Sequence, residues 1–163
     1  MKVLNKKQIN QKIKRVAIEI LENNYDQRSG LVFLGINNNG MAFAKMLISA
    51  LKKFAKRDFP LYQLRVNAAN PISEPIGIDV EIESLKDKSI IIVDDVANTG
   101  RTIFYCFEPL LKIIPRSIEI AVLVDRKHKL FPVHVDYFGL TLATTHKEHI
   151  DVRLGDEMVV LLD

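Results

Sequence analysis

The stretch IIIVDDVANTGRT, residues 90–102, decides how the rest of the chain is interpreted. Its four aliphatic residues, 90–93, do not alternate with polar ones, which predicts a strand buried on both faces, as in a parallel sheet. Burying two neighbouring carboxylates is costly, so Asp94 and Asp95 are expected where this strand reaches the surface. Small, turn-forming residues follow, and a helix is predicted over 101–112.

Helices and strands alternate along most of the chain, which predicts an α/β fold with helices flanking a central, mainly parallel sheet. Asn5 and Gln8 have the spacing that marks a helix start. Helices are predicted over 5–24 and 41–56, and strands over 31–36, 61–66, 89–94, 118–124, 135–140, 150–154 and 158–162. We expect a single domain over 1–163, in which residues 67–84 form a long loop of the kind that is usually functional or mobile.

Bulk composition indicates an ordinary soluble protein. A hydrophobic content of 48% with 26% charged residues suits a globular domain with a full core. The net charge of +3 is mild and does not by itself imply a nucleic-acid or membrane partner. The single cysteine, Cys106, lies in an apolar helical segment, which favours an inert core thiol. With no apolar run of membrane-spanning length, we expect a cytoplasmic protein.

The loop after the two acids suits an anion. Ligands of open parallel sheets bind at the carboxyl ends of the strands, and the first N–H groups of a helix lack intrahelical partners. Thr99 and Thr102 add hydroxyl donors, and Arg101 adds a charged donor whose direction the sequence does not give. Carboxylates beside this loop would repel a bare polyphosphate. A ribose 5-phosphate fits better, with its hydroxyls on the acids, and a divalent cation could bridge acids and ligand.

Other interpretations of these residues fit less well. An isolated pair of aspartates before a turn is usually a solvated strand end. A phosphate-receiver domain also pairs acids at a strand end, but there the pair closes the first strand, whereas Asp94 and Asp95 follow the third. His146 and His149 could be metal ligands, although without a cysteine nearby they are more typical of surface histidines.

The stretch VDDVANTGRT, residues 93–102, resembles the phosphoribosyl-pyrophosphate (PRPP) motif of type I phosphoribosyltransferases. A second stretch, AVLVDRKHKLFPVHVDYFGL, residues 121–140, is similar to the corresponding region of the pyrimidine-operon regulator/uracil phosphoribosyltransferase family. The order of elements agrees over roughly residues 5–160. The resemblance implies a type I phosphoribosyltransferase fold with a hood loop. It also implies transfer of ribose 5-phosphate from PRPP to a nitrogenous base, with release of pyrophosphate and use of Mg²⁺.

The resemblance also implies a role for each stretch of the site. Asp94 and Asp95 would bind the ribose hydroxyls, and residues 67–84 would be a mobile hood. The ring of Tyr137 would lie against the base, and the backbone of Phe138 would read the base edge. Mg²⁺ would arrive with PRPP and have no direct protein ligand. The 5′-phosphate would be held by Ala97, Asn98, Thr99, Gly100, Arg101 and Thr102, and the pyrophosphate by Ile36, Asn37, Asn38, Asn39 and Gly40.

The sequence departs from the family in its charges. Related enzymes usually carry an arginine in the pyrophosphate loop and a basic residue in the hood, whereas this loop has three asparagines and residues 67–84 contain no lysine or arginine. Losing one well-placed donor costs about 3–4 kcal/mol of barrier. Supplementary cations could come from Arg65, Arg126 or Lys127, or from a partner subunit of a homodimer or higher homo-oligomer.

Two functions therefore stay open. The first is a phosphoribosyltransferase acting on a small base, with uracil as the leading candidate. Purine enzymes of the superfamily tend to have an acid where Asn98 stands, and an amide cannot act as a general base. The second is a catalytically weak regulator that senses PRPP or a nucleotide, with RNA as a possible partner.

Overall fold

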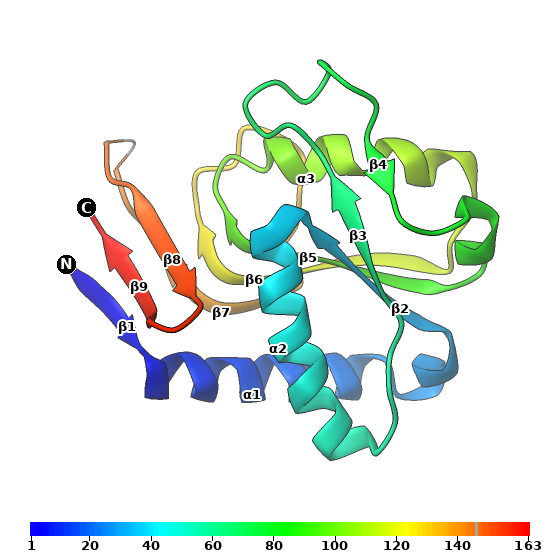
Figure 1. Ribbon diagram of the computed structural model, residues 1–163, viewed down its shortest axis with the longest axis horizontal. Helices are drawn as coiled ribbons and strands as arrows, with labels where there is room; N and C mark the ends of the chain where they lie inside the picture. Colours follow the sequence, from blue (N-terminus) through cyan, green and yellow to red (C-terminus); the bar gives the residue numbers. More distant parts are fainter. Residues whose placement is uncertain (146) are drawn as a thin grey trace.

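The structure is a computed structural model that describes residues 1–145 and 147–163, with the side chains of 27–29 outside the description. Its described strands form two sheets (Figure 1). The larger has the order β4-β3-β2-β5-β6-β7, and all neighbouring pairs are parallel except β3 with β4. The predicted, mainly parallel sheet is therefore confirmed. Its strands are β2 (Leu31–Ile36), β3 (Leu61–Arg65), β4 (Gly77–Ile78), β5 (Ser89–Ala97), β6 (Ser117–Arg126) and β7 (Tyr137–Leu142).

Helices cover both faces of this sheet. Two long ones, α1 (Lys6–Asn23) and α2 (Asn37–Ala55), pack on one face, and the short α3 (Arg101–Cys106) lies on the other, as Figure 1 shows. Three 3-10 helices complete the described helices: η1 (Tyr25–Gly30), η2 (Ile82–Leu85) and η3 (Glu108–Lys112). None of the described helices has the length and apolar character needed to cross a membrane.

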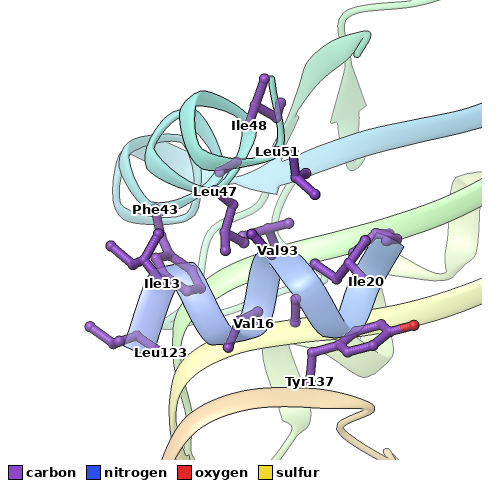
Figure 2. Close-up of a cluster of buried hydrophobic side chains, with 14 of the residues drawn as sticks. Ile13, Val16, Ile20, Phe43, Leu47, Ile48, Leu51, Val93, Leu123 and Tyr137 are labelled. Atoms are coloured by element: carbon purple, nitrogen blue, oxygen red, sulfur yellow. The ribbon is translucent and has the colours of Figure 1, made fainter. Parts of the chain in front are cut away.

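The unbroken aliphatic run of β5 is explained by two hydrophobic cores. Ile91 and Val93 face the core beneath α1 and α2, part of which Figure 2 shows, whereas Ile90 and Ile92 face the core beneath α3 and η3. All four side chains are fully buried. Each contributes roughly 1.5–3 kcal/mol on burial, so this strand is held firmly from both sides.

The smaller sheet joins the two ends of the chain. Its order is β1-β9-β8, with β1 (Lys2–Asn5), β8 (Ile150–Leu154) and β9 (Met158–Leu162) all antiparallel. Leu4, Ile150 and Val160 belong to the core that α1 and α2 form with the main sheet. The small sheet is therefore anchored beside the main one, and β8 lies against the end of β5 where the acids stand.

Three differences from the predicted elements bear on the site. The second helix begins at Asn37 rather than residue 41, so the predicted pyrophosphate loop is its first turn. The helix predicted over 101–112 is split into α3 and η3 because Pro109 lacks an N–H and disfavours helical geometry before it. β5 continues pairing with β6 as far as Ala97, so both acids stand within the strand.

Candidate active site

A cavity of about 470 Å³ opens at the carboxyl edge of the main sheet. It brings together stretches that are far apart in the sequence. These are the two acids, residues 97–102 (the phosphate loop), residues 36–40 (the asparagine loop) and the wall formed by β8. Such an edge is where open α/β sheets bind ligands. The cavity is lined by Ile36, Asn37, Asn38, Asn39, Ala68, Asp94, Asp95, Val96, Asn98, Thr102, His149, Ile150, Asp151 and Val152.

The two acids lie next to each other in the lining of this cavity. The Asp95 N–H donates to Asp94 Oδ1 at 2.9 Å, and the Val96 N–H donates to Asp95 Oδ1 at 2.9 Å. Burial raises the pKa of Asp94 well above its usual range, and the charge of Asp95 raises it further. Burial also raises the pKa of Asp95, although hydrogen bonds, including one from Asn39, lower it in part. The charge of Asp95 thus disfavours ionisation of Asp94. The pair suits hydroxyl donors or a cation.

The phosphate loop encloses a second, smaller cavity of about 50 Å³, lined by Asp94 and residues 96–103. This exceeds the roughly 10–15 Å³ that one water requires. Gly100 has φ 85°, a left-handed conformation that a side chain would strain. Behind the loop, the N–H groups of Leu130 and Phe131 donate to the Thr99 carbonyl at 2.9 and 3.2 Å. The neighbouring segment therefore holds the loop in shape.

The asparagine loop supplies two amides to the cavity, not three. Asn37 is engaged elsewhere, because its Nδ2 donates to the Val66 carbonyl at 2.8 Å and its Oδ1 accepts from the Val66 N–H at 3.0 Å. Asn38 and Asn39 are exposed. A Cβ on Gly40 would lie 2.5 Å from the Val93 carbonyl oxygen, so only glycine lets the first turn of α2 approach the end of β5 this closely.

Of the predicted supplementary cations, only Arg126 reaches the site. Its Nη1 donates to Asn98 Oδ1 at 3.1 Å, and it also binds Thr144 and Thr145. Because arginine only donates, Asn98 must present its own donor, Nδ2, on its other side. Arg65 is paired with Asp79 across β3 and β4. None of the three is among the described residues that line the cavity, and Arg126 contacts it through Asn98.

Arg101 does not turn toward the phosphate loop. Its backbone N–H donates to Thr99 Oγ1 at 3.3 Å, within the loop. Its guanidinium instead reaches the segment after β3, where Nη2 donates to the carbonyls of Ala68 at 2.9 Å and Ala69 at 3.4 Å. The phosphate loop thus offers backbone groups and hydroxyls, and its charged side chain is used to hold another loop.

Known proteins resemble this chain in sequence and in fold. The sequence matches the phosphoribosyl transferase domain over residues 2–157. The chain belongs to this family. It is 34% identical over 161 residues to the bifunctional protein PyrR of Pediococcus pentosaceus, covering 91% of this chain and 90% of the relative. It is also 34% identical over 172 residues to PyrR of Clostridium beijerinckii, covering 99% and 96%.

Solved structures agree on the fold. The hypoxanthine phosphoribosyltransferase of Trypanosoma cruzi superimposes with a TM-score of 0.82, covering 99% of this chain and 95% of that one. At 18% sequence identity this likeness shows the type I phosphoribosyltransferase fold alone. The PyrR relatives place the chain close to one branch of the family, as the PRPP motif and residues 121–140 predicted.

The structure contradicts the predicted base contacts of Tyr137 and Phe138. Tyr137 is 1% exposed and packs beneath α1 (Figure 2), where its hydroxyl donates to Glu119 Oε2 at 2.8 Å and accepts from Asn24 Nδ2 at 3.2 Å. Burial and the neighbouring Glu119 raise its pKa. The Phe138 carbonyl accepts from Arg15 Nη2 at 2.7 Å. Neither residue lines the cavity within the described chain, because β7 begins at Tyr137, well before the carboxyl edge.

Several residues of the site carried no recognised sequence signal. Lys129 donates to Asp125 Oδ1 at 2.6 Å and to the Ala97 carbonyl at 3.4 Å, bringing a positive charge behind the phosphate loop. An acid followed four residues later by a lysine, just after a predicted strand, could have suggested this pair. The wall of His149, Ile150, Asp151 and Val152 depends on how β8 packs against β5, which local sequence does not reveal.

Two further expectations concern metals and thiols. His146, named with His149 as a possible metal ligand, lies outside the described residues. Among the residues that are described, no group of three or more histidine, cysteine or acidic side chains could hold a metal ion. Cys106 is fully buried, and burial, together with the charge of Asp94, raises the pKa of its thiol to about 12. The predicted inert core cysteine is confirmed.

Replacing Tyr137 by phenylalanine tests its revised role. Because Glu119 and Asn24 would lose a buried partner, we expect the free energy of unfolding to fall by about 1–3 kcal/mol, with nucleotide affinity unchanged. Urea unfolding and titration with uridine monophosphate measure the two effects. Tyr105→Phe removes the same atom from a partly exposed ring and is the control. Weaker nucleotide binding without a loss of stability would restore Tyr137 to the base site.

Replacing Asp94 by asparagine tests the coupled pair. Since the folded-state pKa of Asp94 is raised, the native protein holds more protons than the unfolded one, and stability falls as pH rises above the usual value of 3.8 toward the folded pKa. Asp94→Asn removes this loss of stability. The loss is about 1.4 kcal/mol for each pKa unit by which Asp94 differs between the folded and unfolded states. We therefore expect the variant to be more stable than the wild type at about pH 8, with the gain shrinking toward about pH 4.

Urea unfolding across this pH range measures the difference. Asp156→Asn, on an exposed turn between β8 and β9, is the matched control and should follow the wild type. A destabilised Asp94→Asn variant at neutral pH would show that the carboxylate is favourable in the ligand-free protein, contrary to this account.

Proposed function

We propose that this chain transfers ribose 5-phosphate from PRPP to a small nitrogenous base, with uracil as the leading candidate, and releases pyrophosphate. The observation that carries the proposal is the 470 Å³ cavity, in which paired acids, a phosphate-sized loop and a second loop of amides meet at one sheet edge. Each of these parts matches one part of PRPP.

The paired acids suit the ribose. Hydroxyl groups at C2 and C3 can donate to the carboxylate oxygens of Asp94 and Asp95, which favours the ionised form of the pair. Mg²⁺ would arrive with PRPP and be held by ligand oxygens and water, beside the negative charge of the two carboxylates. Mg²⁺ bound with PRPP would neutralise charge on the departing pyrophosphate. Ligand binding should therefore strengthen as pH rises and the pair loses its proton.

The phosphate loop suits the 5′-phosphate. Small residues let the backbone N–H groups of residues 97–102 come close to an anion, and Thr99 and Thr102 add hydroxyls. Lys129 lies behind the loop and binds the Ala97 carbonyl at 3.4 Å. The contribution of this loop depends on its shape, because α3 is only six residues long and its dipole is small.

Asn98 supports a carbonyl-bearing base. Arg126 holds its Oδ1 at 3.1 Å, so the amide presents a fixed donor, and Asn98 lines the cavity. Uracil offers carbonyl oxygens to such a donor. A base that must exchange a proton with this position is disfavoured, since an amide is neither a useful acid nor a base near neutral pH.

A second candidate function is favoured by the charges. No lysine or arginine is among the described residues that line the cavity, so Asn38 and Asn39 are the loop side chains available to the pyrophosphate. Neutral donors stabilise a growing negative charge less than cations do. A regulator that binds PRPP or a nucleotide and catalyses the transfer only slowly would have such a neutral cavity lining. RNA would be one partner to test for such a regulator.

Calorimetric titration with PRPP and Mg²⁺, followed by addition of uracil and an assay for pyrophosphate, separates the two functions. Binding followed by pyrophosphate release supports the transferase. Binding without release across a panel of bases supports the sensor.

The combined substitution Asp94→Asn with Asp95→Asn tests the site itself. We expect PRPP affinity to fall at least about a hundredfold, because several charge-assisted hydrogen bonds are lost together. Asp156→Asn again serves as the control. If PRPP bound the double variant as tightly as the wild type, the ribose would lie elsewhere and the assignment of the acids would be wrong.

A further inference from the structure

The hood loop, residues 67–84, is held where it leaves β3 by two other loops of the site. The backbone of Val66 is bound on both its N–H and its carbonyl by the side chain of Asn37, from the asparagine loop. The carbonyls of Ala68 and Ala69 are bound by Arg101, from the phosphate loop. Figure 1 shows this segment leaving β3 and arching over α3 before it returns to β4.

The first turn of the hood also has hydrogen bonds of its own. Asn67 Oδ1 accepts from the N–H groups of Ala69 at 3.1 Å and Asn70 at 3.3 Å, and its Nδ2 donates to Ser73 Oγ at 3.2 Å. Ser73 in turn donates to the Asn70 carbonyl at 2.8 Å. This closed turn presents the Ala68 and Ala69 carbonyls outward, where a charged donor can take both.

Arg101 is the residue best placed to hold this turn. Residues 67–84 have no lysine or arginine of their own, so the hood cannot anchor itself through a cation. Arg101 also begins α3, and its N–H takes part in the phosphate loop, so its backbone is fixed where the phosphate would sit. A charge-assisted bond to a carbonyl is about twice as strong as a neutral one.

The contact also shapes the cavity. Ala68 lines the 470 Å³ cavity alongside the acids and the asparagine loop, so the position of the first hood turn sets one wall of the site. Farther along, the hood is held by pairing of β4 with β3 and by the ion pair between Arg65 and Asp79. Those contacts lie at the returning end of the loop, whereas Arg101 binds the first turn and Asn37 binds Val66 just before it.

We propose that Arg101 is a positioning residue that holds the first turn of the hood against the cavity and links it to the phosphate loop. This rests on the proposed function only in naming PRPP as the ligand. Its direct consequence, an ordered first turn, is a property of the ligand-free protein.

Hydrogen–deuterium exchange of the ligand-free protein tests this consequence. In Arg101→Ala, we expect the amides of Ala69 and Asn70 to exchange roughly ten- to a hundredfold faster than in the wild type, because the turn opens more often. Arg101→Lys keeps a charged donor and should bring exchange back to within about threefold. Lys112→Ala, which removes an exposed charge from η3, is the control and should leave the turn unchanged.

Titration with PRPP and Mg²⁺ distinguishes positioning from direct binding. If Arg101 positions the hood, Arg101→Ala should change PRPP affinity by less than about threefold while lowering kcat about tenfold or more wherever turnover is measurable. Unchanged exchange at the first turn would overturn the proposal. So would a tenfold loss of affinity without faster exchange, which would make Arg101 a phosphate ligand. If the wild type fails to bind PRPP, the proposed function fails, and exchange still decides the role of Arg101.

Discussion

The structure depends on two neighbouring carboxyl groups that lie half-buried at the end of a strand whose preceding residues are buried on both faces. β5 continues to pair with β6 beyond Asp94 and Asp95 as far as Ala97. The backbone of the two acids is therefore fixed within the strand. Burial raises the pKa of both carboxyl groups. Such a pair destabilises the ligand-free protein, and the two aliphatic cores on either side of β5 offset that loss.

The surrounding loops are arranged around this strand end. Gly40 lets the first turn of α2 approach the Val93 carbonyl, which brings Asn39 within reach of Asp95. On the other side, Gly100 adopts a left-handed conformation that turns the chain from β5 into α3. Both glycines therefore serve the same end: they allow two loops to meet where the acids stand. Backbone geometry, more than any single charged side chain, builds this site.

The parts that were predicted from the sequence depend on local signals. The aliphatic run of β5, the turn after it and the capping box of Asn5 with Gln8 all follow from residues within a few positions of one another. What could not be predicted depends on contacts between distant segments. β1 pairs with β9 at the other end of the chain, and β8 becomes a wall of the cavity only through that sheet. The buried position of Tyr137 likewise depends on the register of β7 with β6.

The direction in which each cationic side chain points could not be predicted either, because it also depends on contacts between distant segments. These directions matter most for catalysis. Lys129 and Arg65 are bound to carboxylates, which hold a cation firmly. Arg126 is bound to three neutral oxygens, from Asn98, Thr144 and Thr145. A phosphate or pyrophosphate group is a stronger acceptor than any of these, so it can compete for Arg126 and not for the paired cations. Arg126 therefore bears directly on whether this fold catalyses or only binds, because it contacts the cavity-lining Asn98 and a charged ligand can displace its neutral partners.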